Sequence, residues 1–170
     1  FRSLCHIIVG QQLAGSAVKA IWAKFVIALG EVTPAAVLAQ DIEALRVSAG
    51  LSRAKGLAIA DLAAHYRRGD LSDAVLMNPS LSAADLSAKL LAVKGIGPWT
   101  ANMILLFTLC RPDILPLGDL GVVRAMEKLY AGGDELERDA LLALAEPWRP
   151  YRTVATWYLW RSLDSEPVEY

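Results

Sequence analysis

The stretch that decides the fold is residues 90–101, which read Leu90-Leu91-Ala92-Val93-Lys94-Gly95-Ile96-Gly97-Pro98-Trp99-Thr100-Ala101. Two glycines on either side of one aliphatic residue predict a very tight turn between two helices, because glycine adopts left-handed backbone conformations without steric cost. Pro98 suits the first turn of the second helix, where a backbone N–H would have no helical partner. The amides at this helix start form a ready anion site. A plain structural corner is the alternative reading.

The rest of the chain is helical by the same kind of pattern. Apolar residues recur at spacings of three and four, and no stretch alternates with period two. We expect the longer helices at 1–9, 15–29, 52–68, 82–93, 98–109, 119–130, 134–146 and 150–163. The predicted fold is all-α, a single 1–170 domain with helical lobes at roughly 31–115 and at 1–30 plus 116–170. The helix-hairpin-helix occupies about 82–109.

Composition narrows the class of protein. The chain has 170 residues, 55% of them hydrophobic, and no apolar run of the length of a membrane span. We expect an intracellular protein in which Cys5 and Cys110 are buried reduced thiols, too few for a four-cysteine metal or iron–sulfur site. Because the first residue is Phe1 and not an initiator methionine, we expect a truncated start. Whether another lobe precedes Phe1 is left open.

The charge balance limits how the chain can bind nucleic acid. It carries 17 basic and 18 acidic residues, for a formal net charge of −1. Bulk electrostatic attraction to DNA is therefore weak, and any DNA binding has to depend on a local patch and on backbone groups.

Residues 90–101 resemble the hairpin of the helix-hairpin-helix (HhH-GPD) DNA glycosylase superfamily. In that family an aspartate stands at the start of the next helix, and Pro116-Leu117-Gly118-Asp119-Leu120-Gly121-Val122 matches this pattern. Other segments resemble the alkylpurine (3-methyladenine) branch, namely Ile8-Val9-Gly10-Gln11-Gln12-Leu13, Gly50-Leu51-Ser52-Arg53-Ala54-Lys55, Trp148-Arg149-Pro150-Tyr151-Arg152 and Trp157-Tyr158-Leu159-Trp160. These segments follow the family's order along nearly the whole chain.

The resemblance implies that Asp119 is the catalytic carboxylate. Breaking the N-glycosidic bond of a nucleotide builds positive charge on the sugar, and a fixed carboxylate stabilises that state. A helix N-terminus favours the ionised carboxylate. The alternative is that Asp119 is only a helix N-cap, and the two roles are compatible.

Relatives that also cut the DNA strand carry a lysine nucleophile after the hairpin, where this sequence has Trp99. An indole cannot form a Schiff base, so the resemblance implies a monofunctional enzyme without lyase activity. It also implies a base pocket lined by Trp99, Trp160, Met103 and Leu120, in which aromatic rings attract cationic alkylated purines. Met103 and Leu120 stand where some relatives have tyrosines, which puts the substrate range in doubt.

The expected DNA contacts are Gln12, Lys94, Gly95, Gly97 and Thr100. Gln12 matches the side chain that fills the gap left by a flipped base, and the others match phosphate contacts. Gln11 is expected to tie backbone together, and Arg149 and Arg152 to brace the catalytic helix rather than touch DNA. No side-chain metal site or cofactor is expected, although hairpin carbonyls of this family can hold a monovalent cation.

The predicted function is therefore base excision repair, in which alkylated bases such as 3-methyladenine and 7-methylguanine are hydrolysed from duplex DNA by a monomeric enzyme. The alternatives are a non-catalytic helix-hairpin-helix DNA-binding module, a helical interaction domain, or a glycosylase for oxidised or mismatched bases. His6 and His65 are expected to be ordinary core or surface residues.

Overall fold

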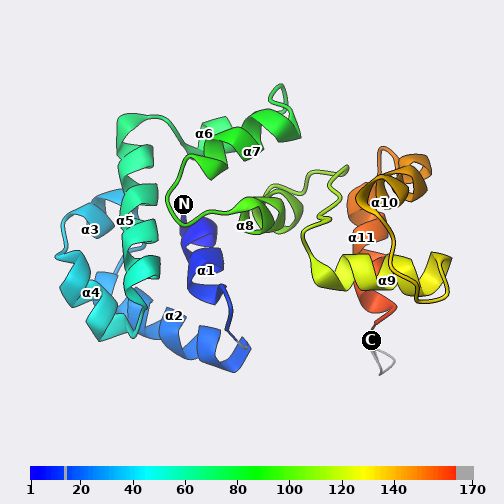
Figure 1. The fold of residues 1–170 in the computed structure, drawn as a ribbon. Helices are drawn as coiled ribbons and strands as arrows, with labels where there is room; N and C mark the ends of the chain where they lie inside the picture. Colours follow the sequence, from blue (N-terminus) through cyan, green and yellow to red (C-terminus); the bar gives the residue numbers. More distant parts are fainter. Residues whose placement is uncertain (14, 164–170) are drawn as a thin grey trace, which may run out of the picture. The chain divides into compact units, whose positions relative to one another are not determined.

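The computed structural model describes residues 1–13 and 15–163, and all regular structure in this part of the chain is helical (Figure 1). This confirms the all-α prediction. The elements are α1 (Arg2–Gly10), α2 (Gly15–Leu29), α3 (Pro34–Leu38), α4 (Ile42–Ala49), α5 (Arg53–Arg68), α6 (Asp73–Leu76), α7 (Ala83–Leu91), α8 (Pro98–Met103), the π-helix η1 (Ile104–Thr108), α9 (Leu120–Tyr130), α10 (Arg138–Ala145), the 3₁₀ turn η2 (Glu146–Trp148) and α11 (Arg152–Arg161).

The chain divides into two compact units, Phe1–Leu109 and Cys110–Tyr170. Helices α1 and α2 belong to the first unit, since α2 packs against α4 and α1 packs against α5 and η1. The two units therefore place residues 1–30 with the first unit, whereas the expected lobes group residues 1–30 with residues 116–170. That grouping stays a prediction.

The first unit is built around α5, which α1, α3 and α4 contact (Figure 1). Its N-cap is Ser52, whose hydroxyl accepts the Lys55 amide at 3.3 Å, and it ends at Gly69 in the left-handed conformation. Its buried residues recur at helical spacing, and the side chains of Ile59 and Leu62 are fully covered. The apolar residues that recur at helical spacing in this part of the sequence thus lie on the face of α5 that packs into the core.

The helices around residues 92–97 form where the sequence predicts them, with one difference. A capping box between Ser82 and Asp85 begins α7, and Pro98 begins α8. The second helix is not uniformly α-helical to residue 109, because the backbone widens after Met103 and the Leu109 amide bonds to the Ile104 carbonyl at 2.9 Å. Apolar spacing alone does not distinguish such a π turn from a continuing α-helix.

The second unit packs α9 against α11 over a small core. The core consists of Val122, Ala125, Met126, Leu141, Ala145 and Leu159. The expected helix at 134–146 is shorter, because it begins only at Arg138, after the turn that contains Gly132 and Gly133.

The two cysteines differ from the expectation that both are buried. Cys5 is buried on α1, and this burial raises the pKa of its thiol to about 12. Cys110 is exposed, so the prediction for it is wrong. It follows the last turn of η1 and has a positive φ of 48°, where the chain leaves the helix and no longer faces the core.

Residues 1–13 and 15–163 contain neither a membrane-spanning helix nor a metal-binding cluster of side chains. No helix there is both long and apolar enough to cross a membrane. In the same part of the chain, no three His, Cys, Asp or Glu side chains are grouped so that they could hold a metal ion.

Candidate active site

The hairpin turn rests on helix α5 at Gly95. Gly95 has a φ of +84°, and a Cβ atom built on it would lie 2.6 Å from the Cβ atom of Ala58. A side chain at this position would therefore be strained by the backbone conformation and would also collide with α5. One turn further along α5, Asp61 accepts the backbone N–H of Lys94 at 2.8 Å.

The other side of the hairpin is held from the end of α1. The Gln11 side-chain amide donates to the Gly95 carbonyl and to the Thr100 hydroxyl, each at 3.0 Å. Gln11 is itself fixed, because the Lys55 ammonium donates to the carbonyls of Val9 and Gln11 at 2.8 and 2.7 Å. Burial lowers the pKa of Lys55. The predicted role of Gln11 as a tie between backbone segments agrees with these contacts.

Gln12 directly follows Gln11, the residue whose side chain is hydrogen-bonded to the hairpin. Gln12 is exposed and has a positive φ of 55°, which is uncommon for a residue with a side chain. Lys94, Gly95 and Gly97 are also exposed, so their expected contacts with DNA phosphates are sterically open.

Thr100 requires a correction. Its side chain was expected to contact phosphate, but the residue is only 5% exposed and its hydroxyl receives the Gln11 amide. In this structure Thr100 is part of the internal tie between α1 and α8. The sequence could not indicate this, because a threonine two residues into a helix after a hairpin suits either role.

The two predicted pocket residues of α8 differ in exposure. Trp99 is 43% exposed, whereas Met103, one turn later, is 6% exposed and belongs to the core of the first unit. Trp99 can therefore present its indole to a ligand as the structure stands. Met103 can contribute only a small part of its surface.

In the second unit the structure brings Asp119 and Trp160 together. The Trp160 Nε1–H donates to Asp119 Oδ1 at 3.0 Å, and the same oxygen accepts the Val122 amide at 3.1 Å. Asp119 is thus the N-cap of α9, held by a second helix, α11. Hydrogen bonds of this kind fix the orientation of a carboxylate.

Gly121 provides the space for this pair. A Cβ atom at Gly121 would lie 3.0 Å from Asp119 Oδ1 and 3.3 Å from Trp160 Cδ1. The adjacent Leu120, a predicted pocket residue, is 68% exposed. The second glycine of the Gly118-Asp119-Leu120-Gly121 segment therefore has a packing role that the sequence pattern did not single out.

The two arginines after η2 brace the second unit. Both reach Asp113: Arg149 Nη1 lies 2.9 Å from Oδ2, and Arg152 Nε lies 2.6 Å from Oδ1. The hydrogen bond from Arg152 holds the pKa of Asp113 below its ordinary value. These contacts hold the connection that precedes Asp119, and the expected bracing of the catalytic helix itself stays a prediction.

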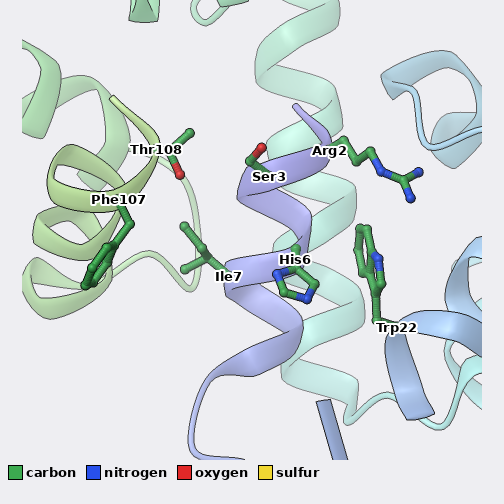
Figure 2. A pocket seen from close by; sticks show the side chains of 7 residues that line it. All are labelled: Arg2, Ser3, His6, Ile7, Trp22, Phe107 and Thr108. Carbon is green, nitrogen blue, oxygen red and sulfur yellow. The ribbon is translucent and has the colours of Figure 1, made fainter. Parts of the chain in front are cut away.

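A separate cleft of about 490 Å³ lies in the first unit (Figure 2). Its lining residues are Arg2, Ser3, His6, Ile7, Trp22, Phe107 and Thr108. The Arg2 guanidinium lies 5.2 Å from the centre of the Trp22 ring, and the His6 ring meets Trp22 edge-on at 4.8 Å. None of the predicted site residues lines this cleft.

Residues 5–150 match the HhH-GPD family model, described as the HhH-GPD superfamily base excision DNA repair protein. The chain belongs to this superfamily. A curated relative, the putative DNA-3-methyladenine glycosylase YfjP of Bacillus subtilis, is 38% identical over 86 residues, which are 51% of this chain and 30% of that protein. DNA-3-methyladenine glycosylase 1 of Schizosaccharomyces pombe is 30% identical over 165 residues, covering 95% of this chain and 72% of that protein.

The chain spans about a third of the length of YfjP and of a second Bacillus subtilis relative, DNA-3-methyladenine glycosylase. Among solved structures, the DNA-3-methyladenine glycosidase of Bacillus halodurans is 36% identical with a TM-score of 0.87, covering 96% of this chain and 75% of that one. The Schizosaccharomyces pombe glycosylase Mag1, solved with abasic DNA, is 28% identical with a TM-score of 0.79, covering 99% and 82%.

Proposed function

We propose that this chain is a monofunctional DNA glycosylase of base excision repair that removes alkylated purines from duplex DNA. The observation that carries the proposal is the Asp119 carboxylate, oriented at the start of α9 by the Val122 amide and the Trp160 indole. The relatives named as 3-methyladenine glycosylases support the substrate class.

In the proposed reaction the bond between the sugar C1′ and the base nitrogen breaks, and its electron pair leaves with the base. Positive charge then develops on the sugar, where the Asp119 carboxylate stabilises it. A water oxygen bonds to C1′, and the proton that it loses passes to the carboxylate or to solvent. An intact abasic site remains.

The first unit supplies the DNA contacts in this proposal. Lys94 and the hairpin amides near Gly95 and Gly97 bind the phosphate backbone, and Gln12 fills the gap left by the flipped base. Binding by a few backbone amides and one lysine is consistent with a chain whose net charge is −1.

For recognition of the base, the first unit offers Trp99 and, to a smaller degree, Met103, and the second unit offers Trp160 and Leu120. Alkylated purines such as 3-methyladenine and 7-methylguanine are electron-poor, so an exposed indole face attracts them more strongly than it attracts normal purines. Trp99 also stands at the lysine position of strand-cutting relatives, which leaves the enzyme without an amine nucleophile. We infer a monomer that acts on duplex DNA inside the cell.

The test is base release from duplexes that each contain 3-methyladenine, 7-methylguanine, hypoxanthine or ethenoadenine and, for comparison, from duplexes with 8-oxoguanine or a mismatched base. The proposal predicts release of at least one of the alkylated purines, with no strand cleavage and no adduct after borohydride treatment. DNA binding without release of any base would instead identify a non-catalytic module. Release of 8-oxoguanine or of mismatched bases alone would move the chain to another glycosylase class.

A further inference from the structure

One face of α5 supports the hairpin. Asp61 is the residue on this face that makes a polar contact with it. Ala58 lies under Gly95, and Asp61, three residues later, accepts the Lys94 amide at 2.8 Å across 33 residues of sequence. Residues three apart on a helix share a face, so the two contacts form one platform. The Asp61 side chain is 33% exposed.

His65 extends this platform by one further turn. Its Nε2 lies 3.6 Å from Asp61 Oδ2, and its Nδ1 lies 3.2 Å from Asp70 Oδ2. Asp70 in turn accepts Arg68 Nε at 2.9 Å. The Lys94 amide and His65 Nε2 thus approach the same oxygen of Asp61, Oδ2, and the amide makes the hydrogen bond.

A carboxylate at this place has two opposite effects on phosphate binding. Its negative charge repels a phosphate bound at the turn, although solvent at a partly exposed site weakens this repulsion. Its hydrogen bond fixes the backbone of the turn, and a turn that is already ordered loses less entropy when it binds. The two effects can be separated, because an asparagine keeps the acceptor oxygen and removes the charge.

We propose that Asp61 is a positioning residue for DNA binding: its carboxylate holds the Lys94 amide and so fixes the hairpin in the conformation that binds phosphate. The inference rests on the proposed function of the hairpin. The backbone amide of Lys94 is thus engaged by Asp61, although the residue as a whole is exposed. Gln11 holds the same turn from α1, so the hairpin is restrained on two sides.

The experiment compares Asp61→Ala and Asp61→Asn with the parent chain. Binding to an undamaged duplex is measured by fluorescence anisotropy at fixed low salt, and the excision rate is measured in single turnover at saturating enzyme. We expect Asp61→Ala to raise Kd about fivefold to tenfold, which is less than the loss of a hydrogen bond to a charged group alone would cause, because removing the carboxylate also relieves its repulsion of phosphate. Asp61→Asn should bind within about twofold of the parent, or more tightly.

The excision rate at saturation should change less than about twofold in both variants, because the hairpin orders before the chemical step. Hydrogen exchange of the Lys94 amide gives a direct readout: it should accelerate in Asp61→Ala and stay protected in Asp61→Asn. Glu31→Gln, an exposed carboxylate in the same unit, controls for the loss of one negative charge.

Equal or tighter binding by Asp61→Ala would overturn the positioning role and leave only charge repulsion. If Asp61→Ala does not fold, Asp61→Asn alone decides, since a weakening above about fivefold contradicts the proposal. A parent chain that binds no duplex DNA would overturn the proposed function, and the positioning role with it. A parent that binds but releases no base would overturn the glycosylase proposal only.

Discussion

The indole Nε1–H of Trp160 donates a hydrogen bond to Oδ1 of Asp119, the oxygen that also caps α9 by accepting the Val122 amide. The two residues are 41 positions apart and come from α11 and the start of α9. This bond connects a predicted pocket tryptophan with the predicted catalytic carboxylate, so Trp160 can act on the reaction through Asp119 as well as through the base.

Trp160→Phe tests this connection, because phenylalanine keeps an aromatic face and removes only the donor. A hydrogen bond to a carboxylate contributes about 1.5–3 kcal/mol, so we expect base excision in single turnover to slow about tenfold or more, with little change in the Kd for DNA. Trp157→Phe on the same helix is the matched control and should remain near the parent rate. Equal rates for the parent and Trp160→Phe would show that the bond does not matter for the reaction.

Gly121→Ala should disturb the same pair by steric contact. The added methyl would lie 3.0 Å from Asp119 Oδ1 and 3.3 Å from Trp160 Cδ1, so the carboxylate or the indole has to move. We expect excision to slow at least about tenfold, since a small misplacement of a reacting group has a large effect on rate. Gly118→Ala, where a methyl would meet no atom within 4 Å, is the control. If both variants retain parent activity, the site tolerates the displacement.

Gly95→Ala should weaken DNA binding through the hairpin. The substitution places a side chain at a φ of +84° and 2.6 Å from the Ala58 Cβ, so the turn has to shift away from α5. We expect a Kd about tenfold higher and a lower Tm, from a backbone strain of about 1–2 kcal/mol and the steric clash. Adding Ala58→Gly removes the clash and should restore part of the binding. Parent-like binding by Gly95→Ala alone would contradict this packing.

Asp113 stabilises the second unit at neutral pH, and this contribution should be lost at low pH. Its pKa is lowered, mainly by the hydrogen bond from Arg152, so its contribution to stability is complete above the unfolded-state value near 3.8 and is lost as pH falls through the lowered pKa. Asp113→Asn should therefore lower Tm at pH 7, by the equivalent of about 1 kcal/mol or less for a partly exposed pair. The difference from the parent should shrink towards pH 3.

Circular dichroism melting curves at several pH values check this prediction. Asp134→Asn, an exposed carboxylate in the same unit, should leave Tm almost unchanged at every pH. A difference between parent and Asp113→Asn that stays constant from pH 7 to pH 3 would show that the charge of Asp113 is not its source.

Most of the fold follows from local signals in the sequence. Ser52 and Ser82 cap helices as their positions before apolar periods predict, and Gly50 and Gly69 end helices in the left-handed conformation. Such signals operate within a few residues, so they can be read without a structure. The π turn at 104–108 and the late start of α10 have no comparable local signature.

The site was predictable only in part, because its long-range hydrogen bonds have no local pattern. The hairpin glycines could be found by their spacing, and Asp119 by the resemblance of residues 116–122 to the family pattern. The hydrogen bonds from Gln11 to Thr100, from the Lys94 amide to Asp61 and from Trp160 to Asp119 join residues 33 to 89 positions apart. Thr100 differs from its predicted phosphate contact for this reason, since only the tertiary structure shows that the residue is buried and that its hydroxyl accepts a hydrogen bond from Gln11.

The central claim is that Asp119 stabilises the charge that develops on the sugar, and Asp119→Asn tests it most directly. Asparagine can still cap α9 and accept the Trp160 and Val122 bonds, so folding and the Kd for DNA should remain close to the parent values. Single-turnover release of 3-methyladenine or 7-methylguanine should fall at least about a hundredfold, as expected when a fixed charge is removed from a reacting centre. Near-parent excision by a folded Asp119→Asn variant would contradict the account.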